Sequence, residues 1–171
     1  MTSSSGSGDR CENVTAGGER LWGACTPEEE ETYKKILRDH FQNSPFYRHM
    51  GLKVTGLGPG WAAFEMPAGR HLWNAGGILH GGAITSIADS ASGAALATLL
   101  DKDNERPITI ELKVNFCSPV KEGVLYARGH VVQKGRRIAI CEVDVTGEDG
   151  EPVAKGISTY MVRELETGRA S

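Results

Sequence analysis

The residues that could do chemistry concentrate in one short stretch of the chain. Asn74-Ala75-Gly76-Gly77-Ile78-Leu79-His80-Gly81-Gly82 leads directly into a segment with helical periodicity, and Asp89 follows nine residues after His80. Glycines at a helix start expose backbone N–H groups, which together with the helix dipole can bind an anion or polarise a carbonyl. A carboxylate one to two turns further along could act as a general base or a nucleophile. An ordinary glycine turn and a solvated carboxylate are the alternatives.

The helix that would carry Asp89 is predicted over 78–100. One apolar stripe recurs at spacings of three and four residues and comprises Ile84, Ile87, Ala88, Ala91, Ala95 and Leu99. A second stripe, small and polar, comprises Gly82, Ser86, Asp89 and Gly93 on roughly the opposite side. A helix of this kind needs two neighbours, a sheet and a second surface such as another subunit.

The remaining elements form the frame for this helix. Thr26, Pro27 and Glu29 make a capping box that starts an early helix, and a short second helical turn runs from Ser44-Pro45 to Gly51. Strands are predicted over 52–57, 61–66, 108–116, 124–133, 138–146 and 153–162. Residues 108–116 alternate without a fault, which predicts one buried face and one polar face. The order predicts an α+β fold with one antiparallel sheet packed on one principal helix.

Length and composition set the outer limits. The 171 residues are expected to form one domain over 26–165, with a flexible tail over 1–25 and a C-terminal tail over 166–171. A net charge of −3 argues against nucleic-acid binding. No apolar run or signal sequence indicates a membrane or secretion, so we expect a cytoplasmic protein. The four cysteines and five histidines lack metal-ligand spacing, so no metal site is expected.

The motif Asn-x-x-Gly-x-Leu-His-Gly-Gly, with Asp nine residues after the His, resembles the hotdog-fold thioesterases of the phenylacetate-degradation (PaaI-like) group. The resemblance runs from about Gly51 to Val162. It includes the strand 108–116, its exit Cys117-Ser118-Pro119-Val120 and the hairpin Gln133-Lys134-Gly135-Arg136-Arg137. It implies a sheet wrapped around one long helix and a homodimer, with a dimer of dimers as a further option. It also implies hydrolysis of an acyl-coenzyme A thioester to the free acid and coenzyme A, at sites on the subunit interface.

The resemblance also implies roles for individual residues. The Gly81 N–H would polarise the thioester carbonyl, and Asp89 from the partner subunit would activate water or attack directly. Asn74 would hold the water or the substrate, and His80 would shape the carbonyl site, with a structural histidine as its alternative. Thr109 occupies a strand position where related enzymes often carry a small hydroxyl residue.

Further residues are candidates for substrate binding. Trp73, Gly82 and Ser90 adjoin the motif. Lys134, Arg136 and Arg137 could meet the phosphates of coenzyme A, or form a solvated turn. No G-x-S-x-G surrounds Ser90, so a serine hydrolase is not indicated. No cofactor is expected, because coenzyme A is part of the substrate. The alternative function is a non-catalytic acyl-CoA-binding or regulatory hotdog protein. A hotdog hydratase or dehydratase is disfavoured, because its local motif differs.

Overall fold

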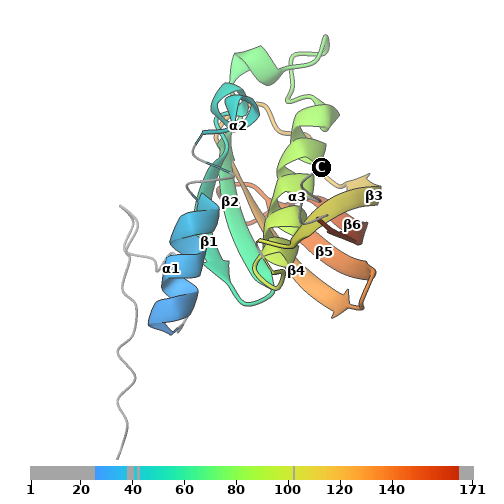
Figure 1. The fold of residues 1–171 in the computed structure, drawn as a ribbon. Coiled ribbons are helices and arrows are strands. Elements are labelled where there is room, and N and C mark those ends of the chain that lie inside the picture. The colour runs from blue at the N-terminus through green and yellow to red at the C-terminus, as the bar shows by residue number, and fades with distance from the viewer. Residues whose placement is uncertain (1–25, 38–40, 42, 102, 166–171) are drawn as a thin grey trace, which may run out of the picture.

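A computed structural model describes residues 26–37, 41, 43–101 and 103–165. The predicted tails, 1–25 and 166–171, lie outside this part. The helices are α1 (Pro27–Ile36), α2 (Pro45–Met50) and α3 (Gly81–Ala97), with a short 3-10 turn at Arg70–Leu72. The strands are β1 (Lys53–Gly58), β2 (Trp61–Pro67), β3 (Glu105–Phe116), β4 (Val124–Lys134), β5 (Ile138–Thr146) and β6 (Pro152–Glu164). Figure 1 shows this arrangement.

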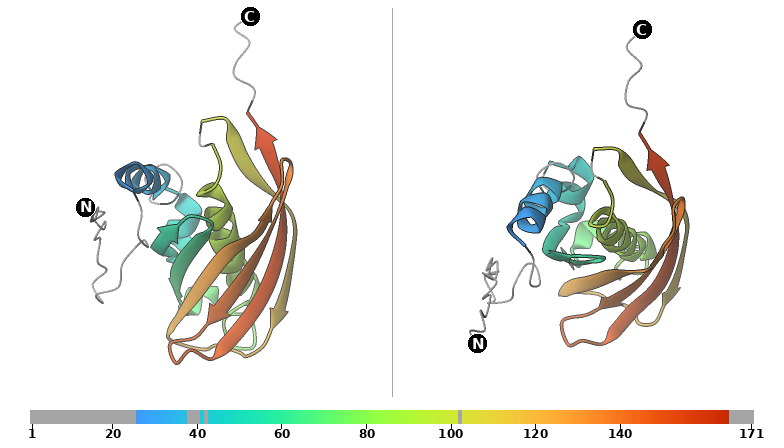
Figure 2. Two further views of the ribbon diagram at one scale, coloured as in Figure 1. Left: turned by 90° about the horizontal axis from the view of Figure 1, so that it is seen from below. Right: turned by 60° about the horizontal axis from the view of Figure 1, so that its bottom comes forward.

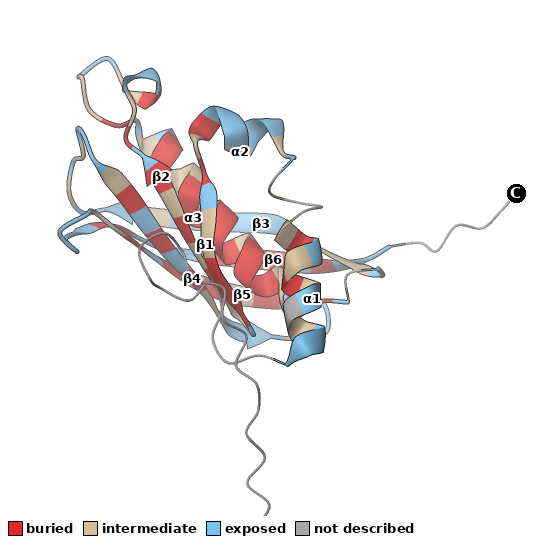
Figure 3. Ribbon diagram, turned by 90° about the vertical axis from the view of Figure 1, so that its left-hand side faces the viewer, coloured by how far each residue is buried: buried red, intermediate tan, exposed pale blue. Residues whose placement is uncertain are grey.

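The strands form one antiparallel sheet in the order β1-β2-β4-β5-β6-β3. The sheet curls around α3, and α1 lies at its open side near β1 (Figure 2). Figure 3 shows the buried residues on α3 and on the strand faces turned toward it. This is the predicted hotdog architecture, in which a curved sheet encloses a single long helix.

The predicted helix caps are confirmed. Thr26 and Glu29 exchange both hydrogen bonds of a capping box at the start of α1. Ser44 caps α2, and Gly51 ends it with φ +70°, a conformation that favours glycine. These signals are local in sequence, so they do not depend on tertiary packing.

Helix α3 is shorter at both ends than the predicted span 78–100. His80 is its N-cap and Thr98 its C-cap. The predicted apolar stripe is buried from Ile84 to Ala95, but Leu99 lies beyond the helix and is 39% exposed. The prediction for Leu99 was therefore wrong, because the helical periodicity was extended past the helix end.

Strand β3 departs from the prediction most clearly. The register against β6 shifts between Thr109 and Glu111, which leaves Ile110 as an extra residue in a β-bulge. Thr109 pairs with Tyr160, and Leu112 pairs with Ser158, both on the face of β6 turned toward α3. The predicted buried face is also open, because β3 is an edge strand of the sheet. Ile110 is 57% exposed and Phe116 is 56% exposed in the single chain.

Candidate active site

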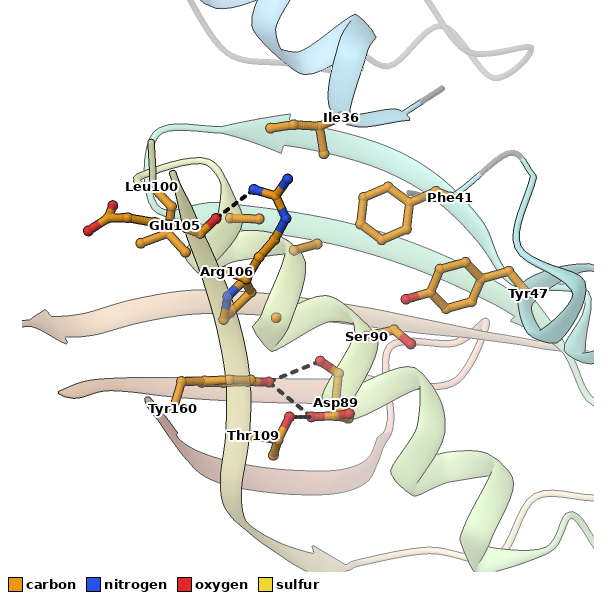
Figure 4. Close-up of a pocket in the computed structure, with 14 residues that line it drawn as sticks. Ile36, Phe41, Tyr47, Asp89, Ser90, Leu100, Glu105, Arg106, Thr109 and Tyr160 are labelled. Atoms are coloured by element: carbon orange, nitrogen blue, oxygen red, sulfur yellow. Dashed lines mark hydrogen bonds between the residues drawn. The ribbon is translucent and has the colours of Figure 1, made fainter. Parts of the chain in front are cut away.

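Asp89 lies on the side of α3 that faces β3 and β6, and two hydroxyl groups fix its carboxylate. The Thr109 hydroxyl donates to Asp89 Oδ1 at 3.0 Å. The Tyr160 hydroxyl lies 3.0 Å from the same Oδ1 and 3.1 Å from the Asp89 carbonyl oxygen. No described residue donates a hydrogen bond to Oδ2. One carboxylate oxygen is thus anchored, and the other is left for a ligand or water (Figure 4).

The surroundings of Tyr160 keep its hydroxyl group protonated, so that it can donate a hydrogen bond. The residue is 2% exposed, and burial raises the pKa of its hydroxyl well above the ordinary range, with the Asp89 charge raising it further. Burial likewise raises the pKa of Tyr47, a side-chain hydrogen bond with Ser90 lowers it, and the Asp89 charge raises it. Both phenols therefore stay protonated at neutral pH, and Tyr160 can donate only to the aspartate.

A pocket of about 280 Å³ opens beside Asp89. Its polar end carries Asp89, Ser90, Thr109 and Tyr160. Its other walls come from α1, Phe41, α2, the second half of α3 with the segment after it, and the start of β3. The residues of these walls are Ile36, Phe41, Tyr47, Gly93, Ala94, Ala97, Leu100, Glu105, Arg106 and Pro107. The structure thus brings together three predicted site residues, Asp89, Ser90 and Thr109.

The other half of the predicted motif lies at the start of α3. His80 Nδ1 accepts a hydrogen bond from the Gly82 N–H at 2.8 Å, so His80 caps the helix. No acceptor for the Gly81 N–H is found among the described residues. A Cβ atom at position 81 would lie 3.2 Å from the Phe116 ring, so a side chain there would press on this ring. The helix start therefore presents a backbone donor beside an exposed aromatic ring.

Asn74 shapes the loop before this helix. Its side-chain oxygen accepts hydrogen bonds from the Gly76 N–H at 2.8 Å and the Ile78 N–H at 3.4 Å. Asn74 therefore holds the loop that delivers His80 to the helix start, and does not line the pocket beside Asp89.

Helix geometry separates the two halves within one chain. Gly81 and Asp89 are eight residues apart on α3, which corresponds to about 12 Å along its axis at 1.5 Å per residue. A single carbonyl group cannot be in hydrogen-bond contact with both. Any site that uses both residues on one carbonyl must take them from two chains.

The remaining predicted residues lie apart from the pocket. Trp73 donates its ring N–H to the Lys121 carbonyl and packs beneath Arg70. Lys134, Arg136 and Arg137 are exposed at or beside the turn that joins β4 to β5. The sequence analysis did not identify Tyr160 as a site residue, because a tyrosine on the inward-facing side of a strand is expected to belong to the hydrophobic core. The indication in the sequence was its hydroxyl group, because the hydroxyl of a buried tyrosine usually has a hydrogen-bond partner.

Neither a metal centre nor a membrane span stands out in the described residues. They contain no group of three or more His, Cys, Asp and Glu side chains that could hold a metal ion. No helix among them is long and apolar enough to cross a membrane.

Comparisons with known proteins agree with this fold. Residues 76–154 match the model of the Thioesterase superfamily. A Saccharolobus solfataricus protein that bears an esterase name is 32% identical, covering 78% of this chain and 89% of that protein. The human acyl-coenzyme A thioesterase 13 is 26% identical, covering 75% of this chain and 93% of the human protein. The crystal structure of a thioesterase family protein from Silicibacter pomeroyi is 31% identical with a TM-score of 0.71, covering 78% of this chain and 99% of that one.

The chain belongs to the thioesterase superfamily. It is an enzyme of the thioester hydrolase class with a hotdog fold, as predicted. Assignment to the PaaI-like subgroup stays a prediction.

Proposed function

We propose that this protein hydrolyses acyl-coenzyme A thioesters to the free acid and coenzyme A, with Asp89 as the catalytic carboxylate. The observation that carries the proposal is the anchoring of Asp89 Oδ1 by two hydroxyl groups beside a pocket with aliphatic and aromatic walls. Such a carboxylate is preorganised, which lowers the cost of positioning it during the reaction. A thioester carbonyl then needs only an activated water and a donor for the developing oxyanion.

The proposed reaction uses water, the Asp89 carboxylate and the Gly81 N–H to cleave the thioester. Asp89 accepts a proton from water as the water oxygen adds to the thioester carbon. The carbonyl oxygen becomes an oxyanion that accepts a hydrogen bond from the Gly81 N–H. Collapse of this intermediate breaks the C–S bond, and the coenzyme A sulfur leaves with the proton held by Asp89. Direct attack by Asp89 is the variant route, and neither route uses a cofactor.

We propose that the working unit is a homodimer in which Gly81 of one chain meets Asp89 of the other. The roughly 12 Å between these residues on one helix supports this arrangement. Strand β3 supports it further, because an exposed edge of 12 residues with Ile110 and Phe116 uncovered invites pairing with another chain. Ile108, Ile138 and Met161 align across three strands on the outer face, which offers a surface for a dimer of dimers.

Lys134, Arg136 and Arg137 keep their proposed role as contacts to coenzyme A phosphates. They are exposed cations about the β4–β5 turn, and phosphates favour such groups. Replacing Arg136 and Arg137 by alanine should raise KM severalfold with kcat nearly unchanged. An unaltered KM would remove them from the site. We also propose that the protein acts in the cytoplasm.

The deciding experiment measures hydrolysis of a panel of acyl-CoA thioesters by the wild type and by Asp89→Asn. The asparagine keeps an oxygen to accept from Thr109 and Tyr160, so the fold should persist. Loss of general-base help should lower kcat by roughly 10²–10⁴-fold. Full activity in the variant would refute the role of Asp89. A wild type that binds acyl-CoA without turnover would instead favour the non-catalytic binding protein.

A further inference from the structure

Helix α1, Phe41 and helix α2 contribute one wall of the pocket beside Asp89. Ile36, Phe41 and Tyr47 line the pocket, although the family match begins only at residue 76. Ile36 is 2% exposed, so its side chain is packed inward. The Phe41 ring lies 5.3 Å from the Tyr47 ring and meets the Phe64 ring edge-on at 5.5 Å, centroid to centroid. These contacts make the wall an ordered apolar surface.

The opposite wall is made of small residues. Gly93, Ala94 and Ala97 face this space from the second half of α3. A Cβ atom on Gly93 would lie 3.5 Å from the Tyr160 hydroxyl, an ordinary contact, so even this position has room for a methyl group. The pocket thus exists because α3 carries little side-chain volume on the side opposite Ile36, Phe41 and Tyr47.

The chemistry of the lining favours an apolar occupant. Asp89, Thr109 and Tyr160 stand at one end, and Ile36 and Leu100 stand toward the other (Figure 4). Charged side chains come from Glu105 and Arg106. The Arg106 guanidinium donates to the Glu105 carbonyl, and the Glu105 carboxylate accepts from the Asp101 N–H. Most of the remaining lining is aliphatic or aromatic, which suits an acyl group better than a nucleotide.

We infer that this pocket holds the acyl group of the substrate and that the wall formed by Ile36, Phe41 and Tyr47 sets the size of acyl group accepted. The inference rests on the proposed function, because it places the thioester at Asp89. A volume of about 280 Å³ holds about eight to ten methylene-sized groups, at roughly 30 Å³ each, the liquid volume of one water. The substrate class is therefore a medium-length acyl or an arylalkanoyl group of similar volume. The wall at Ile36 and Leu100 lies opposite Asp89 (Figure 4) and limits the length of a chain that stays within the pocket.

The test measures kcat/KM for a series of saturated acyl-CoA thioesters from acetyl to palmitoyl, with phenylacetyl-CoA added. The wild type should prefer a medium chain, with a gain of roughly three- to fourfold per added methylene up to the optimum. Ala97→Leu, which fills the pocket from α3, should move the optimum to shorter chains. Ile36→Ala, which opens the opposite wall, should move it to longer chains. Thermal unfolding shows whether each variant is folded, and Ala97→Leu tests the pocket even where Ile36→Ala is too unstable.

Matched controls make the same chemical changes elsewhere. Ala63→Leu lies on the outer face of β2, and Ile157→Ala lies on the outer face of β6, so both should keep the wild-type optimum. Turnover with an optimum that neither pocket variant moves would overturn the inference while leaving the proposed function intact. Binding of S-alkyl-CoA thioethers by calorimetry is measured in parallel. An inactive wild type whose thioether affinity follows the same shifts would refute the proposed hydrolysis and retain the pocket assignment. Affinity independent of chain length would overturn the assignment.

Discussion

Thr109 and Tyr160 reach the same oxygen of Asp89 from neighbouring strands, each at 3.0 Å. The two residues are directly paired across β3 and β6, so the sheet itself sets the spacing of the two donors. This arrangement fixes the rotation of the carboxylate and determines which oxygen faces the pocket.

Tyr160→Phe should lower kcat by roughly 10-fold with little change in KM. A hydrogen bond to a charged group contributes about 1.5–3 kcal/mol, and Thr109 retains part of the anchoring. Thr109→Ser, which keeps a hydroxyl group, should stay near wild-type activity, whereas adding Thr109→Val to Tyr160→Phe should lower kcat further. Steady-state kinetics on the preferred thioester check this. A Tyr160→Phe enzyme within twofold of the wild-type kcat would show that Tyr160 has no positioning role.

Mixed dimers test whether each site takes residues from two chains. Gly81→Val should be inactive, because the added side chain crowds the Gly81 N–H and the Phe116 ring beside it, and Asp89→Asn should be inactive through loss of the base. A mixed dimer of the two variants contains one doubly damaged site and one intact site if Gly81 and Asp89 act across the interface. Purified mixed dimers should therefore regain up to half of the wild-type kcat. Activity no higher than that of the two separate variants would place both residues in one chain's site.

Because the edge of β3 is exposed, a charge introduced at the bulge should prevent pairing with another chain. Ile110→Asp should convert the proposed dimer, with twice the 18.4 kDa chain mass, into a folded monomer. The residue is 57% exposed in the single chain, so the carboxylate costs the monomer little, but an unpaired charge in an interface is strongly unfavourable. Light scattering after size exclusion measures the mass, and Ile157→Asp on the outer face of β6 should keep the pair together. An Ile110→Asp protein that remains dimeric would contradict pairing through this edge.

Stability should fall at alkaline pH partly through Cys141. Burial raises the pKa of its thiol from an ordinary value of 9.0 to about 12. Between these values the unfolded chain loses the proton while the folded chain retains it, so the free energy of unfolding decreases as the pH rises from about 9 to about 12. Cys141→Val removes this titration and fills the same apolar position. The difference in urea-unfolding free energy between variant and wild type should shift in favour of the variant from about pH 8 to about pH 10.5. A pH-independent difference would contradict the assignment.

Local signals in the sequence predicted more of this protein than the long-range ones did. The caps at Thr26 and Ser44 depend on a few neighbouring residues, and both were predicted. Asp89 and Thr109 were predicted as site residues, and the fold brings them into contact. Tyr160 could not be found in the same way, because its role depends on a contact 71 residues away along the chain. The opening of β3 to solvent depends on its place at the sheet edge, which a strand's own alternation does not report.

The bulge at Ile110 acts as a phase shift in the two-residue repeat of β3. Without it, a strand that turns Leu112, Val114 and Phe116 toward α3 would point the Thr109 hydroxyl to the outer face of the sheet. The bulge therefore lets this strand, with all its residues, present apolar side chains and a polar donor on the same side. Deleting Ile110 would remove the bulge and leave Thr109 opposite Tyr160, whereas straightening the strand with all its residues retained would turn Thr109 away from Asp89. The face of the sheet on which Thr109 lies therefore depends on the bulge as well as on the number of residues between Thr109 and Leu112.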